Sequence, residues 1–115
     1  MDYKERLAWL ATLQPGAEVL VVGRGEAIGS VARRSPSGRL IVTVGVREMT
    51  FNPDGNERGG DPLWRADLRP LTPEARDKIE ARRLAEKLAR INFHKLPIEQ
   101  LREVARVLGV EAANG

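Results

Sequence analysis

Few side chains in this sequence are suited to acid–base or nucleophilic chemistry, and none stands beside the partners that such chemistry needs. The chain has one histidine, His94, and no cysteine. A general base must be oriented by a third group and must reach a nucleophile by a hydrogen bond, and the residues around His94, from 92 to 95, provide neither. We interpret His94 as a helix-end residue that the helix dipole favours, and we expect no enzymatic activity and no cofactor.

Carboxylates and one amide gather in the polar stretch at residues 54–61, the best candidate for a cation site. Its possible ligands are Asp54, Asn56, Glu57 and Asp61. An EF-hand loop has fixed ligand spacing and a bidentate glutamate at position twelve, and this stretch has neither feature. We therefore predict a solvated turn and no metal site, and the lack of cysteine excludes cysteine-ligated zinc.

Guanidinium groups are abundant, because arginine outnumbers lysine fifteen to four at a net charge of +3. The guanidinium fork matches phosphate and carboxylate groups, so the bias is typical of a surface that recognises acidic partners. A GC-rich genome, whose codons favour arginine, explains the same bias without any function. The composition leaves both explanations open.

Four basic residues recur on one face of the charged stretch at residues 74–91, in a pattern that we call the basic ribbon. At 100° per residue they fall within about 60° of one another along about 20 Å of helix. Such a ribbon can follow phosphates and displace their counterions, or it can meet an acidic protein. Alternatively, the face is merely solvated, with Glu80 and Glu86 pairing with neighbouring arginines. The ribbon consists of Arg76, Arg83, Lys87 and Arg90.

A second basic group borders the predicted turn at residues 35–38, and neighbouring strands would bring its members together. We predict that it and the ribbon form the surface for nucleic acid or another partner. Aromatic residues, on which single-stranded bases stack, are scarce and stand in apolar contexts, which favours a core position for them. The second group consists of Arg33, Arg34, Arg39 and Arg47.

The elements that must position these residues change in character at Thr72. Before it, a helix over Asp2–Leu13 precedes short β-branched runs that are separated by glycine and proline turns. Four or five short strands with tight turns predict a small antiparallel barrel. The predicted strands are Glu18–Val22, Ile28–Arg34, Leu40–Val46, Arg47–Phe51 as a continuation or a separate strand, and Leu63–Leu68.

After this point the pattern is helical. Thr72 is a typical N-cap before Pro73, and the helix from Pro73 to about Phe93 is expected to bury three apolar residues: Leu84, Leu88 and Ile91. A second helix begins at Pro97 and stops at Gly109. The prediction is an α+β fold in a single domain, 1–115, with an N-terminal helix (1–15), a barrel (16–71) and a C-terminal helical hairpin (72–115).

The glycine loop Gly23-Arg24-Gly25 follows a strand and is similar to the dinucleotide-binding fingerprint. The third glycine, Gly29, is one place too late for that fingerprint, and the next segment is too short for its helix. We prefer a glycine-rich hairpin between twisted strands.

The same region resembles the KOW pattern of SH3-like barrels, which is a P-G-x-x-V-x-V strand, a glycine loop and a G-x-V strand. The matching segments are Pro15–Val21 and Gly29–Val31. Known KOW modules bind RNA, ribosomes or transcription complexes. The resemblance implies an SH3-like barrel and a nucleic acid or nucleoprotein partner.

Most of the chain also resembles a group of small phage and prophage proteins. The shared features are a leading helix, an F-x-x-x-G-x-x-x-G loop (residues 51–59), the L-x-P-L-T-P-E run at residues 68–74, and a final helix after Lys95-Leu96-Pro97. This resemblance implies a viral or mobile-element origin, and it implies no mechanism.

These observations predict a non-enzymatic phage-type binding module whose basic surface contacts nucleic acid or a nucleoprotein complex. One alternative is a protein that inhibits a host defence or transcription component. Another is a virion or assembly protein that oligomerises through Trp9, Leu13 and the C-terminal helix. No apolar run approaches the roughly 20 residues of a membrane span, so we expect no membrane contact and a cytoplasmic location, in the host cell if phage-encoded. The oligomeric state is left open.

Overall fold

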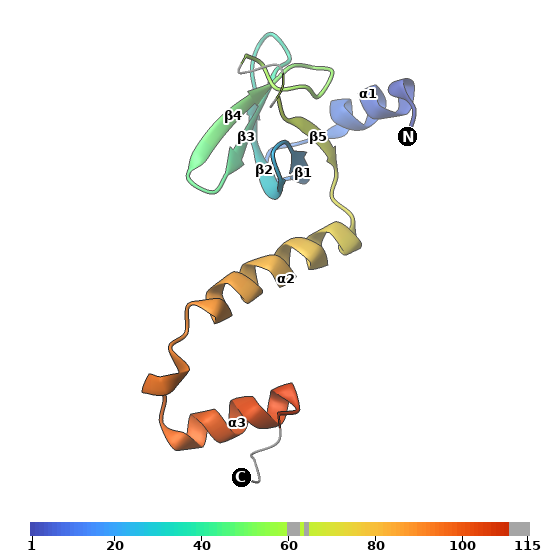
Figure 1. The fold of residues 1–115 in the computed structure, drawn as a ribbon. Coiled ribbons are helices and arrows are strands. Elements are labelled where there is room, and N and C mark those ends of the chain that lie inside the picture. Colours follow the sequence, from blue (N-terminus) through green and yellow to red (C-terminus); the bar gives the residue numbers. More distant parts are fainter. Residues whose placement is uncertain (60–62, 64, 111–115) are drawn as a thin grey trace. The chain divides into compact units, whose positions relative to one another are not determined.

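The computed structural model describes residues 1–59, 63 and 65–110, and within them it has three α-helices and one five-stranded antiparallel sheet (Figure 1). The predicted α+β class is confirmed. The elements in chain order are α1 (Tyr3–Thr12), β1 (Glu18–Val22), β2 (Glu26–Arg34), β3 (Leu40–Val44), β4 (Arg47–Phe51), β5 (Asp67–Pro70), α2 (Pro73–Ala89), the 3₁₀ turn η2 (Phe93–Lys95) and α3 (Ile98–Leu108).

The strand order in the sheet is β4-β3-β2-β1-β5, so that four consecutive strands form a meander and β5 returns to pair with β1. The segment at residues 55–58 forms hydrogen bonds with both edges of the sheet. The Arg58 amide donates to the Thr50 carbonyl of β4 over 2.8 Å, and the Leu68 amide of β5 donates to the Gly55 carbonyl over 2.9 Å. This segment therefore joins the two edge strands at one end.

The inner face of the sheet is packed so closely that one position has room only for hydrogen. A Cβ atom on Gly29 in β2 would lie 2.6 Å from the Val42 Cγ1 atom and 3.0 Å from the Val21 Cγ2 atom. The close approach of these two valines, and not the requirement of a turn, explains why residue 29 is a glycine. The buried core around it consists of Leu10, Leu13, Val19, Val21, Val31, Leu40, Val42, Phe51, Ala66 and Leu68.

Helix α1 begins where the sequence predicted, because the Asp2 Oδ1 atom accepts a hydrogen bond from the Glu5 amide over 2.8 Å. It packs on the sheet through its C-terminal end, where Leu10 and Leu13 are buried, whereas Tyr3 at its start is exposed. Trp9 is partly buried against the same core. Leu13 therefore belongs to the core and does not offer the oligomer contact that the assembly alternative assigned to it.

Three predicted strands differ from the observed ones. The second begins at Glu26 instead of Ile28, because its pairing with β1 extends to Glu26 opposite Val22. The third ends at Val44, because Gly45 has a φ of +62° and begins a tight turn into β4. The last strand is Asp67–Pro70 instead of Leu63–Leu68, since its register is set by pairing with Val19–Val22 of β1. Residues 60–62 of the predicted loop and Trp64 lie outside the described residues.

Helix α2 has the predicted N-cap, since the Thr72 Oγ1 atom accepts a hydrogen bond from the Ala75 amide over 3.1 Å. Its buried residue is Ile79, and the expectation that Leu84, Leu88 and Ile91 are buried is wrong, because they are 50 %, 54 % and 38 % exposed. The helix also ends at Ala89, before the predicted Phe93. Its first half is bonded to the sheet through Arg76 and Arg82.

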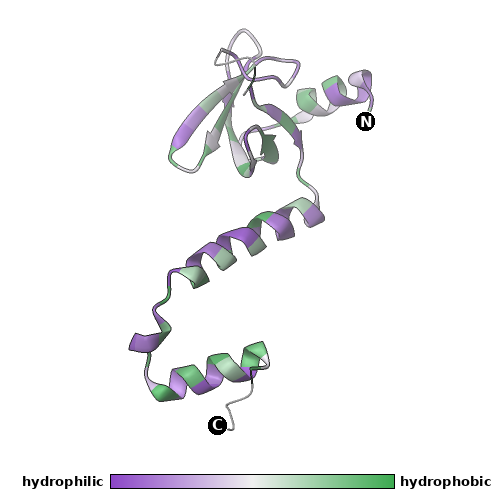
Figure 2. Cartoon of the chain, viewed as in Figure 1, coloured by the Kyte–Doolittle hydropathy of each residue, from purple (hydrophilic) through white to green (hydrophobic). Residues whose placement is uncertain are grey.

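The chain divides into two compact units, Met1–Arg82 and Arg83–Gly115, with the border inside α2 rather than before it. We call them the sheet unit and the helical unit. In the helical unit, α3 ends as predicted at Gly109, which has a φ of +73°. Figure 2 shows hydrophobic and hydrophilic residues alternating along α3 in the pattern of an amphipathic helix, while α2 is largely hydrophilic.

Candidate binding surfaces

The helical unit exposes an unusual amount of apolar surface. No described residue of this unit is buried. Eight of its large apolar side chains are exposed, from 38 % for Ile91 to 68 % for Val107. The eight are Leu84, Leu88, Ile91, Phe93, Ile98, Val107, Leu108 and Val110. Contiguous apolar surface of this kind marks an interaction site more often than scattered single residues do.

Part of this surface is hollowed into a groove of about 290 Å³. One wall is formed by the end of α2 and the turn that follows it, and the other wall is formed by α3. The lining residues are Leu88, Ile91, Phe93, Leu96, Glu103, Val104, Val107 and Leu108. A groove with almost exclusively apolar walls suits apolar side chains of another polypeptide better than a polar small molecule.

The basic ribbon is divided by the structure. Arg76 lies in the sheet unit, where its Nη2 atom is 2.6 Å from the Glu18 Oε1 atom. The side chains of Arg83, Lys87 and Arg90 belong to the helical unit, and the described part of the chain provides no hydrogen-bond or ion-pair partner for them.

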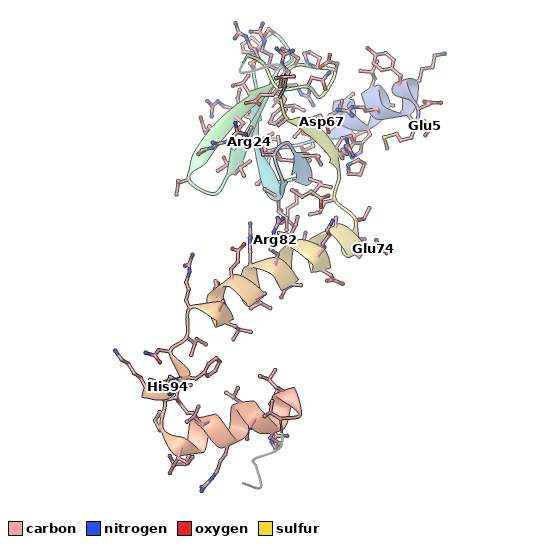
Figure 3. All side chains as sticks on the ribbon, viewed as in Figure 1. Glu5, Arg24, Asp67, Glu74, Arg82 and His94 are labelled. Atoms are coloured by element: carbon pink, nitrogen blue, oxygen red, sulfur yellow. The ribbon has the colours of Figure 1, made fainter. Side chains whose placement is uncertain are left out.

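The ion pairs that the solvated-face alternative assigned to Glu80 and Glu86 do not form among the described residues. Instead, the first half of α2 is bonded to the sheet. Arg82 donates to the Glu26 carbonyl over 2.7 Å, and the Lys78 Nζ atom is 3.8 Å from the Glu26 carboxylate. Figure 3 shows the Arg82 side chain extending toward the strands.

The second basic group is also divided. Arg34 donates through its Nη2 atom to the carbonyls of Leu10 and Leu13, over 3.0 and 3.2 Å, and so binds the end of α1 to β2. Arg33 pairs with Glu48 on β4 over 3.2 Å. Both arginines therefore make contacts that stabilise the fold. The Arg34 contact could not be predicted from the sequence, because its acceptors are backbone carbonyls more than twenty residues earlier in the chain.

The other two members of this group have weaker attachments. The Arg47 Nη2 atom lies 3.5 Å from the Met49 sulfur, which is a poor acceptor. The described residues provide no hydrogen-bond or ion-pair partner for the Arg39 side chain, although its backbone amide donates to the Ser35 hydroxyl over 3.1 Å. The structure therefore does not bring the four arginines into one unpaired patch.

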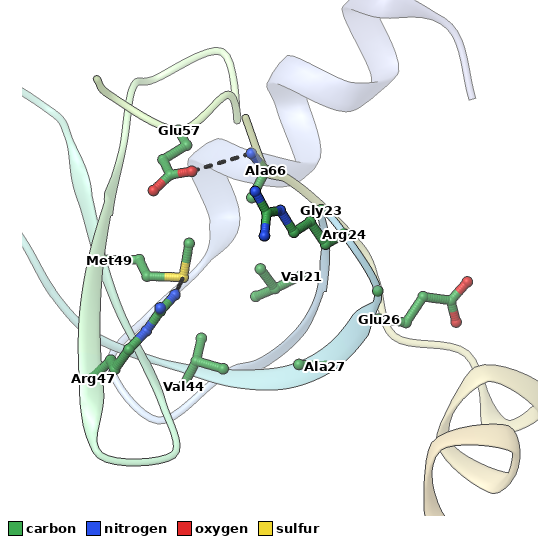
Figure 4. A pocket seen from close by; sticks show the side chains of 11 residues that line it. Val21, Gly23, Arg24, Glu26, Ala27, Val44, Arg47, Met49, Glu57 and Ala66 are labelled. Atoms are coloured by element: carbon green, nitrogen blue, oxygen red, sulfur yellow. Dashed lines mark hydrogen bonds between the residues drawn. The ribbon is translucent and has the colours of Figure 1, made fainter. Parts of the chain in front are cut away.

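Arg47 also lines a cavity of about 570 Å³ in the sheet unit (Figure 4). Apolar side chains from the four strands β1 to β4 form much of its wall, and Arg24, Glu26 and Glu57 also line it. The Glu57 Oε1 atom accepts a hydrogen bond from the Ala66 amide over 3.2 Å. The cavity can admit an acidic group on an apolar body. It was not predicted, because it depends on the curl of the sheet. Its apolar lining comprises Val21, Ala27, Val44, Met49 and Ala66.

The carboxylates that were considered for a cation bind their own loop. The Asp54 Oδ1 atom accepts a hydrogen bond from the Asn56 amide over 2.9 Å, and Asp61 lies outside the described residues. Within the described ranges, no three His, Asp or Glu side chains are placed to share a metal ion. His94 lies in the η2 turn, where its backbone amide donates to the Asn92 side chain over 3.1 Å.

Two guanidinium groups are held by neighbouring carboxylates. A hydrogen bond from Arg69 to Asp67, over 2.9 Å, raises the pKa of Arg69, and a hydrogen bond to Glu103 raises the pKa of Arg106. Both side chains are therefore cations at any pH at which the protein folds.

Compared with known protein families, with curated proteins and with solved structures, the chain matches none of them. Among the helices that the structure describes, none is both long and apolar enough to cross a membrane.

Proposed function

We propose that this protein is a non-enzymatic binding module, in which the sheet unit is the scaffold and the helical unit makes the contact. The observation that carries this proposal is the helical unit itself, where eight large apolar side chains are exposed and no described residue is buried. Short helices are marginal in water on propensity alone, and apolar burial contributes about 25 cal/mol per Å². A partner that covers this face therefore stabilises the unit as it binds.

The chemistry of the surface favours a protein partner. The groove between α2 and α3 has almost only apolar walls, and a nucleic acid offers little apolar surface to fill it. The resemblance to phage and prophage proteins supports a partner in a host-cell cytoplasm. The KOW-like segments support an SH3-like barrel for the sheet unit, and the bridging of β4 and β5 by residues 55–58 is consistent with such closure.

The test compares two valine variants with the same chemical change. Val107→Glu places a charge in the apolar groove, and Val46→Glu places it in the exposed turn between β3 and β4. Each immobilised variant is incubated with nuclease-treated bacterial lysate or with free copies of the chain. We expect the wild type and Val46→Glu to retain the same protein, and Val107→Glu to lose it. Equal retention by all three would refute the helical unit as the contact element.

Nucleic acid binding is the second candidate. It is favoured by the three ribbon residues of the helical unit, Arg83, Lys87 and Arg90, for which the described residues provide no partner. If Arg83, Lys87 and Arg90 each contact a duplex phosphate, the log–log salt slope should be about −2.7. The measurement is fluorescence anisotropy of a labelled duplex across a salt series. The Arg83→Glu, Arg90→Glu double variant should lose binding, whereas Lys4→Glu with Arg58→Glu, which changes the net charge equally, should retain it. A slope near zero would exclude this mode.

A further inference from the structure

We infer that the apolar face of the helical unit is covered by the helical unit of a second copy, so that two hairpins form a symmetric four-helix dimer. This inference rests on the proposed function, since it names the occupant of the same surface. Four properties of the apolar face favour a second copy as its occupant, namely its width, its area, its self-complementarity and the position of the charges around it.

Helix α3 is apolar over more of its circumference than one neighbouring helix can cover. At 100° per residue, its apolar residues span an arc of about 180°, whereas a helix that packs on one side needs only slightly more than about 100°. Within the unit, Leu101, Val104 and Ala105 are half-buried, whereas Leu108 and the two residues at the ends of the arc, Ile98 and Val107, are exposed. A helix in a four-helix bundle packs against two neighbours, and the hairpin supplies one of them. The residues of the arc are Ile98, Leu101, Val104, Ala105, Val107 and Leu108.

The exposed area agrees with a stable dimer. Covering the exposed parts of the eight large apolar side chains would remove on the order of 800 Å² from water per copy, which is the contribution of each partner to a standard interface. Crystal-type or encounter contacts are typically smaller than this. No additional surface of the chain is needed to reach the expected size.

The face is also complementary to itself. A two-fold interface uses the same patch on both copies, so the patch must contain both a depression and projecting side chains. The groove of about 290 Å³ supplies the depression. The projecting side chains are the exposed apolar residues that do not line the groove, namely Leu84, Ile98 and Val110.

The charges of the unit do not oppose this arrangement. On α3, Glu99, Arg102 and Arg106 lie on the half of the helix opposite the apolar arc. Glu103 lies at the edge of the arc and lines the groove, and its carboxylate pairs with Arg106. On α2, Arg83 lies about 100° or more from both Leu84 and Leu88, whereas Lys87 lies about 60° from Leu84 and about 100° from Leu88, at the edge of the apolar face. Two copies can therefore pack their apolar faces together while their basic side chains stay in water, where salt screens the repulsion.

The experiment is light scattering and sedimentation of the full chain across a concentration series. We expect a species of twice the 12.7 kDa chain mass at about 100 µM, far above the dissociation constant of a standard-size interface. Val46→Glu should remain dimeric. Val107→Glu and the milder Leu108→Ser should each weaken the dimer at least about tenfold, which corresponds to 1.4 kcal/mol. Circular dichroism and tryptophan emission verify that the sheet unit stays folded in each variant.

Each other outcome is decisive. A wild-type dimer that neither groove variant weakens would place the interface elsewhere and overturn the inference. A wild-type monomer at about 100 µM would also overturn it. In that case, a lysate protein that is retained by the wild type and lost by Val107→Glu would support the proposed function, with that protein instead of a second copy on the apolar face. A monomer that retains nothing through this face would overturn both.

Discussion

The Arg76 guanidinium lies 2.6 Å from the Glu18 carboxylate, although the two residues are 58 positions apart in the sequence. The next turns of α2 add contacts from Lys78 and Arg82 to Glu26. The basic side chains at the start of α2 thus bind the sheet, whereas those further along it have no partner among the described residues. Residues that sequence spacing places on one ribbon consequently have different roles.

Reversing the charge of Arg76 with Arg76→Glu should lower stability, because the new carboxylate would face that of Glu18. Both side chains are about half exposed, so the loss should be about 1 kcal/mol or less. Combining Arg76→Glu with Glu18→Arg should recover most of it. The measurement is thermal unfolding at low and high salt, and an identical melting temperature for the single variant and the wild type at low salt would argue against the contact.

Arg34→Ala should cost more, about 1–3 kcal/mol, because it removes the Arg34 donor from the Leu13 carbonyl and one of two donors from the Leu10 carbonyl. Arg33 is the matched control, since it stands next in sequence and makes an exposed ion pair with Glu48. Arg33→Ala should cost about 1 kcal/mol or less. Chemical denaturation measures both, and equal losses would mean that the Arg34 contact does not anchor α1.

Thr72→Ala should destabilise the protein by about 1 kcal/mol, because it removes the oxygen that caps α2. Thr72→Ser keeps an oxygen in the same place, so it should lower the free energy of unfolding by only a few tenths of a kcal/mol. Denaturation curves with a helical signal at 222 nm compare the two. If serine and alanine were equally destabilising, the methyl group rather than the cap would be the stabilising feature.

Arg83→Glu combined with Arg90→Glu should leave stability within about 0.5 kcal/mol of the wild type, because both side chains are exposed and no described residue pairs with them. The melting temperature checks this directly. A large loss would show that these arginines stabilise the helical unit, and the salt-dependent binding test of the same variant would then lose its meaning.

Gly29→Ala should cost about 1–3 kcal/mol through overpacking, since the added methyl group would lie 2.6 Å from the Val42 Cγ1 atom. Shrinking its neighbour with Val42→Ala should recover part of that cost in the double variant, and the coupling is read from a double-mutant cycle. Gly25→Ala is the control, because nothing lies within 4 Å of its Cβ position. Additive losses would indicate that the two positions do not touch.

Local signals predicted most of the elements. The caps at Asp2 and Thr72 and the stop at Gly109 depend on atoms within a few residues, so that spacing alone locates them. The β-branched runs likewise predicted the first strands. The last strand was misplaced because its register is set by pairing with β1, which lies far earlier in the chain, and no short window contains that information.

The binding surfaces were less predictable, because burial is decided by tertiary contacts. Apolar spacing alone predicts which residues of α2 share a face, but not that packing ends near Ile79 and leaves Leu84 and Leu88 exposed. Arginine spacing likewise predicts a ribbon, but not that Arg76 meets a carboxylate of β1. The basic surface therefore stays a prediction at Arg83, Lys87 and Arg90.

The crowding around Gly29 also has an evolutionary consequence. Any homologous chain that carries alanine or a larger residue at this position is expected to have a smaller side chain where this chain has Val42, and covariation of the two columns should be visible in an alignment. Homologues that keep glycine at position 29 and valine at position 42 are expected to have the same curvature of the sheet, even where their surface residues have diverged.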